Sequence, residues 1–151
     1  EPDKAIPYAL KGIKADPKKA GPHLMLSLAY NRLGKWDESI ESADKVLALD
    51  PTRCRACYLK GESLSQKEKF EEAIKNINQG LSLTFDENNR IDRDFCYVYG
   101  YLARANVYEK QNKLNDAIAD YEKAIALIHH YGFLNFYQEQ AKQKLTELKK
   151  K

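Results

Sequence analysis

The sequence predicts an all-α fold made of repeated antiparallel helix pairs. A short phrase that ends in a small residue and an isoleucine occurs four times, as DKAI, DESI, EEAI and NDAI. Its small residues lie 34, 34 and 44 positions apart, at Ala5, Ser39, Ala73 and Ala117. Two prolines that each follow an aspartate are also 34 positions apart. Because two separate patterns share one step, the chain is built from a repeated structural unit.

Each unit is expected to contain two helices. Apolar residues recur at helical spacing through Leu26 and Tyr30, and again through Ala43 and Val46. Gly34 falls between these two stretches, where a residue in the left-handed conformation would end the first helix. The proline that follows each pair disfavours helix at the residue before it.

One domain is expected over residues 1–151. Its expected parts are the second helix of an incomplete unit over 1–17, units over 20–51, 54–85 and 95–130, and a capping helix over 133–151. Ten additional residues precede the last unit. We expect them to be absorbed by two helices that are each longer by about a turn and by a polar loop between these helices. The segment FCYVYGYL (95–102) has strand-like residue types, but its tyrosines continue a helical stripe, so a helix is predicted there.

The unit resembles the tetratricopeptide repeat, whose pattern is W-x2-L-G-x2-Y…A-x3-F…P. On that frame the first complete unit supplies His23, Leu26, Ser27, Tyr30, Ser39, Ala43 and Pro51. The resemblance covers about residues 1–130 and implies a right-handed superhelical solenoid, with the first helix of each pair lining a concave groove.

The resemblance also implies a function and a binding surface. The implied function is that of a non-catalytic scaffold, which binds a segment of a partner protein in its groove. The implied partner-binding residues are Leu24, Leu28, Asn31, Arg55, Tyr58, Glu62, Tyr99, Leu102 and Asn106. Family members that clamp the C-terminal carboxylate of heat-shock chaperones need Lys, Arg and Asn at positions that here hold Leu24, Leu28, Leu59, Tyr99 and Ala103. No such clamp is therefore expected.

A structural role is the alternative. Residues 3–15 form a helix with apolar residues and no preceding helix in the sequence. A solenoid end without a polar cap tends to associate or to come from a longer array. Self-association through residues 3–15 is thus a second hypothesis.

No catalytic, cofactor or metal site is expected. Cys54 and Cys57 form a Cys-x-x-Cys, yet no second pair stands at the spacing of a zinc site, and the βαβ setting of a redox motif is missing. Buried cysteine is the expected state. The neighbours His129 and His130 point about 100° apart on a helix, which makes them poor ligands for one ion.

Composition limits the remaining partners and the location. The 25 basic and 22 acidic residues are interspersed, so a nucleic-acid surface is not expected. No apolar run reaches the length of a membrane span. Neither a signal nor a transit peptide is recognisable. The chain has three cysteines, and an odd number argues against a disulfide framework and so indicates a reducing compartment. A cytoplasmic location is therefore predicted.

Overall fold

The computed structural model describes residues 1–83, 90–128 and 135–150. Within these ranges the chain forms α-helices and no strand, which confirms the predicted all-α class. The chain divides into two compact units, Glu1–Gly80 and Leu81–Lys151.

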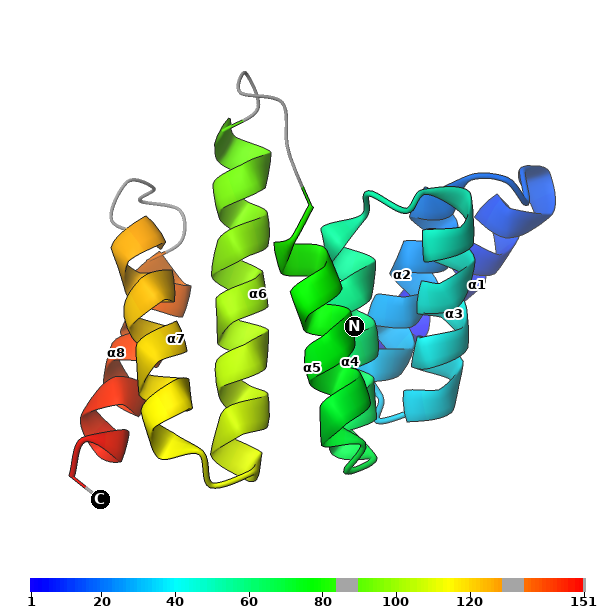
Figure 1. Cartoon of the computed structure of the whole chain (residues 1–151). Coiled ribbons are helices and arrows are strands. Elements are labelled where there is room, and N and C mark those ends of the chain that lie inside the picture. Colours follow the sequence, from blue (N-terminus) through cyan, green and yellow to red (C-terminus); the bar gives the residue numbers. More distant parts are fainter. Residues whose placement is uncertain (84–89, 129–134, 151) are drawn as a thin grey trace. The chain divides into compact units, whose positions relative to one another are not determined.

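Unit 1 (Glu1–Gly80) contains successive antiparallel helices whose bounds repeat every 34 residues. They are α1 (Pro2–Ala15), α2 (Ala20–Arg32), α3 (Trp36–Leu49), α4 (Cys54–Gln66) and α5 (Phe70–Leu81, of which Leu81 belongs to unit 2). The first and last residues of α1 and α3 are offset by 34, and so are those of α2 and α4. Neighbouring helices along the chain lie side by side (Figure 1).

The turn inside each helix pair is closed by one residue in the left-handed conformation. These residues are Gly34, Glu68 and Asn112, with φ values of 72°, 60° and 57°. In each case the next amide donates to the carbonyl oxygen five residues earlier; Lys35 N, for example, lies 2.9 Å from Tyr30 O. This bond satisfies a carbonyl at the helix end that the helix itself leaves free. The prediction at Gly34 is confirmed, and the same turn tolerates Glu and Asn.

Close approach of α4 and α5 completes unit 1. A Cβ atom added to Gly61 of α4 would lie 2.5 Å from Ile77 Cγ1 of α5. Near the other end of the pair, a Cβ atom on Gly80 would lie 2.5 Å from Tyr58 Cε1. Glycine therefore allows these two helices to pack at short distance at both places.

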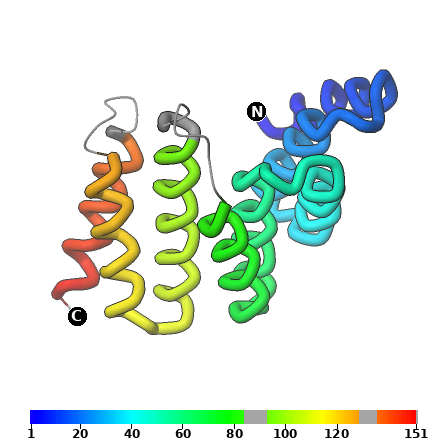
Figure 2. The backbone as a smooth tube through the Cα atoms, turned by 45° about the horizontal axis from the view of Figure 1, so that its top comes forward, coloured from blue at the N-terminus to red at the C-terminus, as the bar shows by residue number. Residues whose placement is uncertain are grey.

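Unit 2 (Leu81–Lys151) contains α6 (Arg90–Lys110), α7 (Leu114–Ile128) and α8 (Asn135–Leu148). Helix α7 packs against both α6 and α8 (Figure 2). The buried core cluster between these three helices consists of Ala105, Ala117, Tyr121, Ala141 and Leu148. Because the last two belong to α8, this helix covers the preceding pair, as predicted for a capping helix.

The additional residues before the last unit are distributed differently from the prediction. Helix α6 has 21 residues against 13 in α4, whereas α5 has 12 against 14 in α3. The expectation that both helices lengthen is thus wrong, since only α6 does. The segment 95–102 lies within α6 and is helical, as predicted.

Candidate functional site

The predicted binding residues of α2 differ in how much they contribute to the core of unit 1. Leu24 is half-buried and packs against the core cluster of Ala43, Val46 and Ala56. Leu28 is half-buried and belongs to the wall of a hollow. Both leucines thus expose part of their side chain, although Leu24 also contributes to the core.

Asn31 is held inside unit 1 by a network of buried serines. Its Nδ2 donates to Ser63 Oγ at 3.1 Å, and Ser63 Oγ donates to Ser39 Oγ at 2.9 Å. Ser39 and Ser27 each donate a hydroxyl to the other's carbonyl oxygen at 3.0 Å. The network joins α2, α3 and α4, so Asn31 has a structural role that the sequence did not indicate.

On α4, Tyr58 is not at the surface. It is 3% exposed, and its ring lies over Gly80 of α5. The sequence frame placed it in the groove, whereas the structure places it between helices. The glycine that admits the ring stands 22 positions further along the chain and would be the signal for this packing.

Arg55 and Glu62, also on α4, form the charged part of the predicted surface. Both are half-buried. Burial raises the pKa of Glu62 to about 7, and the positive charge of Arg55 opposes that rise. Near neutral pH the Glu62 carboxyl is therefore present in both protonation states, so it can either donate or accept a hydrogen bond.

The three predicted residues of unit 2 lie on α6. Tyr99 is half-buried, and its hydroxyl donates to that of Tyr137 while the two rings meet edge-on at 5.0 Å. Leu102 packs against the core. Asn106 is exposed, and its Oδ1 accepts a hydrogen bond from Tyr121 at 2.8 Å. All three therefore contact neighbouring side chains within unit 2.

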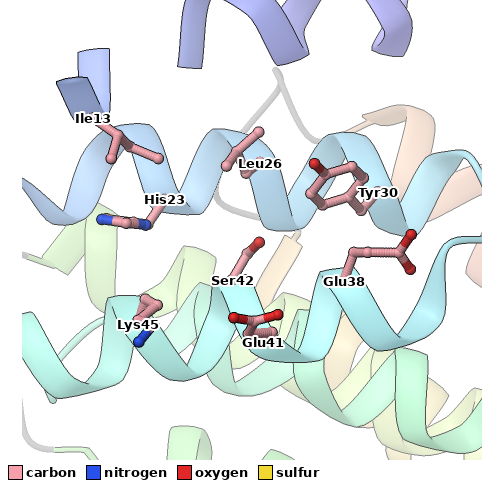
Figure 3. Close-up of a pocket in the computed structure, with 8 residues that line it drawn as sticks. All are labelled: Ile13, His23, Leu26, Tyr30, Glu38, Glu41, Ser42 and Lys45. Carbon is pink, nitrogen blue, oxygen red and sulfur yellow. The ribbon is translucent and has the colours of Figure 1, made fainter. Parts of the chain in front are cut away.

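Sequence reasoning did not find the hollow on the side of α2 that faces α3. It has a volume of about 240 Å³, and side chains of α2 and α3 point into it (Figure 3). The lining residues are Ile13, His23, Leu26, Tyr30, Glu38, Glu41, Ser42 and Lys45. His23 Nε2 lies 3.2 Å from the Pro17 carbonyl oxygen, so this histidine also ties α2 to the preceding turn.

The family is decided by the repeat itself. Three models of the tetratricopeptide repeat match residues 1–53, 55–87 and 98–131. The chain belongs to the tetratricopeptide repeat family. The helix pairs of both units are thus tetratricopeptide repeats, and the resemblance seen in the sequence is confirmed.

Relatives and solved structures agree with this assignment. The Hsp70-Hsp90 organizing protein of Triticum aestivum is 29% identical over 118 residues, 72% of this chain and 20% of the relative. Outer dynein arm-docking complex subunit 4 of Mus musculus is 25% identical over 123 residues, 82% of this chain and 17% of the relative. The chain thus spans a fifth or less of these relatives.

Two solved structures share the fold. A MamA protein is 27% identical with a TM-score of 0.63, over 99% of this chain and 78% of that chain. The pilF protein of Pseudomonas aeruginosa has a TM-score of 0.70 at 18% identity, over 97% of this chain and 67% of that chain. At such low identity the second likeness shows the fold alone.

The cysteine motif lies in the repeat core. Cys54 and Cys57 are both buried, and Cys57 is a free thiol without exposed surface. Burial raises the pKa of the Cys57 thiol, which disfavours the reactive thiolate. Among the residues that the structure describes, no three His, Cys, Asp or Glu side chains gather where they could hold a metal ion. His129 and His130 lie outside the described residues.

Of the helices described, none is long and apolar enough to cross a membrane. The cytoplasmic location and the absence of a nucleic-acid partner remain predictions.

Proposed function

We propose that this chain is a non-catalytic interaction module, which binds a segment of a partner protein on the inner face of its repeats. The observation that carries the proposal is the 34-residue repeat of helix pairs, because this architecture presents the first helix of each pair as a binding surface. The names of two relatives point the same way, since one organizes Hsp70 and Hsp90 and the other belongs to a docking complex.

In unit 1 the contact groups of this surface are Leu28, Arg55 and Glu62. Leu28 supplies an apolar anchor, and the guanidinium of Arg55 supplies donors for carboxylate or carbonyl oxygens of the partner. Glu62, with its pKa near 7, can bond to either a donor or an acceptor of a peptide backbone. Tyr58 is left out because it is buried. The partner segment is therefore expected to be mixed in character, with an apolar residue and a polar or acidic one.

Arg55→Ala is expected to reduce capture of the specific partner at least about tenfold, as removal of a central arginine does at many interfaces. The measurement is an affinity pull-down from a cell extract with quantitative mass spectrometry, followed by titration of the partner identified. Lys75→Ala is the matched control, because Lys75 is an exposed cation of α5. Equal recovery of every protein by the wild type and Arg55→Ala would contradict the proposal.

Self-association through residues 3–15 is the second candidate, and it is favoured by apolar exposure on α1. Tyr8 is 73% exposed and Leu10 is 50% exposed. Sedimentation velocity over a wide concentration range is expected to show a dimer that Tyr8→Lys or Leu10→Lys disperses. A strict monomer at the highest concentration would exclude this candidate.

A further inference from the structure

The hollow between α1, α2 and α3 of unit 1 combines apolar surface with polar groups that have no partner (Figure 3). Leu26, on α2, supplies apolar surface. The Ser42 hydroxyl points from α3 towards α2, and although Ser42 is only 7% exposed, no hydrogen bond of the described residues involves it. Glu38 and Glu41 add two carboxylates that, within the described part of the chain, form no ion pair. The hollow therefore offers negative charge and hydrogen-bond acceptors to a ligand.

The residues of this hollow have counterparts in the last repeat. The counterparts stand 78 positions further along the chain, which is the distance from Ser39 to Ala117 in the repeated phrase. The four pairs of counterparts are Leu26 and Arg104, Ser42 and Asp120, His23 and Tyr101, and Tyr30 and Tyr108.

In the last repeat a guanidinium group fills the equivalent place. Arg104 donates to both carboxylate oxygens of Asp120, at 2.6 and 2.9 Å. Its guanidinium lies 5.7 Å from the centre of the Tyr101 ring and 5.9 Å from that of the Tyr108 ring. Leu26 is shorter than arginine and carries no charge. The volume that an arginine side chain takes in the last repeat is therefore left in unit 1 as the hollow of about 240 Å³.

The intervening repeat also has a long cation at this position. There Lys60 of α4 stands in the place of Leu26, and its amine lies 2.7 Å from a carboxylate oxygen of Asp44 on α3. Helices α3 and α4, which supply this pair, correspond to α1 and α2, so no earlier helix is needed to fill the place. The hollow is open because position 26 holds a short apolar residue.

We propose that this hollow binds the guanidinium group of an arginine side chain from a partner protein. The guanidinium lies between the rings of His23 and Tyr30 and donates to the Ser42 hydroxyl oxygen and the Glu41 carboxylate. The methylene groups of the arginine pack on Leu26. Arginine fits better than lysine, because a planar guanidinium stacks on rings and donates several hydrogen bonds at once. This site shares no residue with the surface that contains Arg55, so it goes beyond the proposed function.

The charges around the hollow favour this cation. Its lining has two carboxylates, those of Glu38 and Glu41, and one lysine, Lys45. The counterpart of Lys45 in the last repeat is Lys123, whose amine lies 3.9 Å from Asp120 while Arg104 occupies the same carboxylate. A lysine at this position is thus compatible with a bound guanidinium.

Titration of the full chain with short peptides tests the site. The probe is a capped peptide with one arginine between alanines, and its binding is followed by NMR shifts of the isotope-labelled chain. Saturable shifts are expected at Tyr30 and Ser42. A peptide with citrulline, which has the shape of arginine without its charge, is expected to bind at least about tenfold more weakly. A lysine peptide is expected to bind less tightly than the arginine peptide.

Variants of the chain make the test specific. Glu41→Gln is expected to weaken binding of the arginine peptide about threefold, as for loss of a partly exposed ion pair. Its matched control is Glu71→Gln, an exposed carboxylate of α5 outside the hollow, which is expected to leave the affinity unchanged, as is Arg55→Ala. The double variant Leu26→Arg/Ser42→Asp copies the ion pair of the last repeat. It is expected to abolish peptide binding while the circular dichroism stays helical, because its own guanidinium fills the hollow.

Several results would overturn the proposal. Absence of saturable binding would do so, and this includes the case in which a segment of the chain itself already fills the hollow. Equal affinity for the arginine and citrulline peptides, or equal loss in Glu41→Gln and Glu71→Gln, would mean that no guanidinium site exists. Tighter binding of free arginine than of the peptide would identify a small molecule as the ligand. A dimer in sedimentation that Glu41→Gln disperses would make a second copy the occupant.

Discussion

Replacement of Asp120 by alanine is expected to lower the free energy of unfolding by about 3–5 kcal/mol, because it removes the carboxylate that accepts two hydrogen bonds from a largely buried arginine. Arg104 donates through Nε to Asp120 Oδ2 at 2.6 Å and through its second terminal nitrogen to Oδ1 at 2.9 Å. The Asp120 side chain is 3% exposed and that of Arg104 is 17% exposed. The hydrogen bond to Asp120 is also the main reason why the pKa of Arg104 is raised.

The surroundings of Arg104 limit its escape to solvent. The guanidinium lies 5.7 Å from the centre of the Tyr101 ring and 5.9 Å from that of Tyr108. These rings stabilise the cation but cannot replace the two hydrogen bonds. Because Arg104 is partly exposed, water can reach its guanidinium. We therefore expect Asp120→Ala to lower the free energy of unfolding by an amount near the lower end of this range.

Urea unfolding of Asp120→Ala beside Asp44→Ala provides the comparison. Asp44 pairs with Lys60 at 2.7 Å but is 51% exposed, and such surface pairs contribute at most about 1 kcal/mol. The double variant Arg104→Met/Asp120→Leu is expected to lose less than Asp120→Ala, because it removes both charges together. If Asp120→Ala and Asp44→Ala were equally stable, the Arg104–Asp120 pair would contribute no more to stability than a surface ion pair.

The repeat period predicts the helices well because each is bounded by local chemistry. The Asp-Pro turn after α3 is an example, since Asp50 Oδ1 accepts hydrogen bonds from the amide and hydroxyl of Thr52 at 3.1 and 2.6 Å. These contacts lie within three residues and repeat with the period, because Asp16 bonds to the amide of Lys18 in the same way. Local chemistry therefore transfers from one unit to the next.

The binding surface is less predictable, because it depends on contacts between distant residues. The frame that assigns Asn31 to the groove does not reveal that a serine 32 positions later accepts its amide hydrogen. Nor does it reveal that Tyr58 finds space over Gly80. The position of a residue within the repeat predicts the side of the helix from which it projects. Whether it reaches solvent depends on the size of its neighbour in another helix.

The added residues before the last unit show a similar limit. Their number follows from the step of 44 instead of 34, but their distribution does not. The segment from Arg90 contains no proline or glycine before Gly100, so nothing in it ends a helix, and α6 extends at its N-terminal side.

Replacement of Gly61 by alanine is expected to destabilise the protein by roughly 1–3 kcal/mol, although alanine favours helix by about 1 kcal/mol. The new Cβ atom would lie 2.5 Å from Ile77 Cγ1, 3.0 Å from Ile77 Cδ1 and 3.1 Å from the Ala73 carbonyl oxygen. Ile77 has no exposed surface, and the Ala73 oxygen belongs to the backbone of α5, so neither neighbour can move without displacing the helix.

Gly21→Ala is the matched control for Gly61→Ala, since no atom lies within 4 Å of the place of its Cβ. Gly21→Ala is expected to be more stable than the wild type by about 0.5–1 kcal/mol. The same substitution in two neighbouring repeats is therefore expected to change stability in opposite directions. Thermal unfolding followed by circular dichroism measures both. Addition of Ile77→Ala to Gly61→Ala is expected to cost less than the sum of the single changes, because it removes the atoms in conflict. If Gly61→Ala and Gly21→Ala changed the free energy of unfolding in the same direction, the close contact of α4 and α5 at Gly61 would not limit stability. The same would follow if the effects of Gly61→Ala and Ile77→Ala were strictly additive.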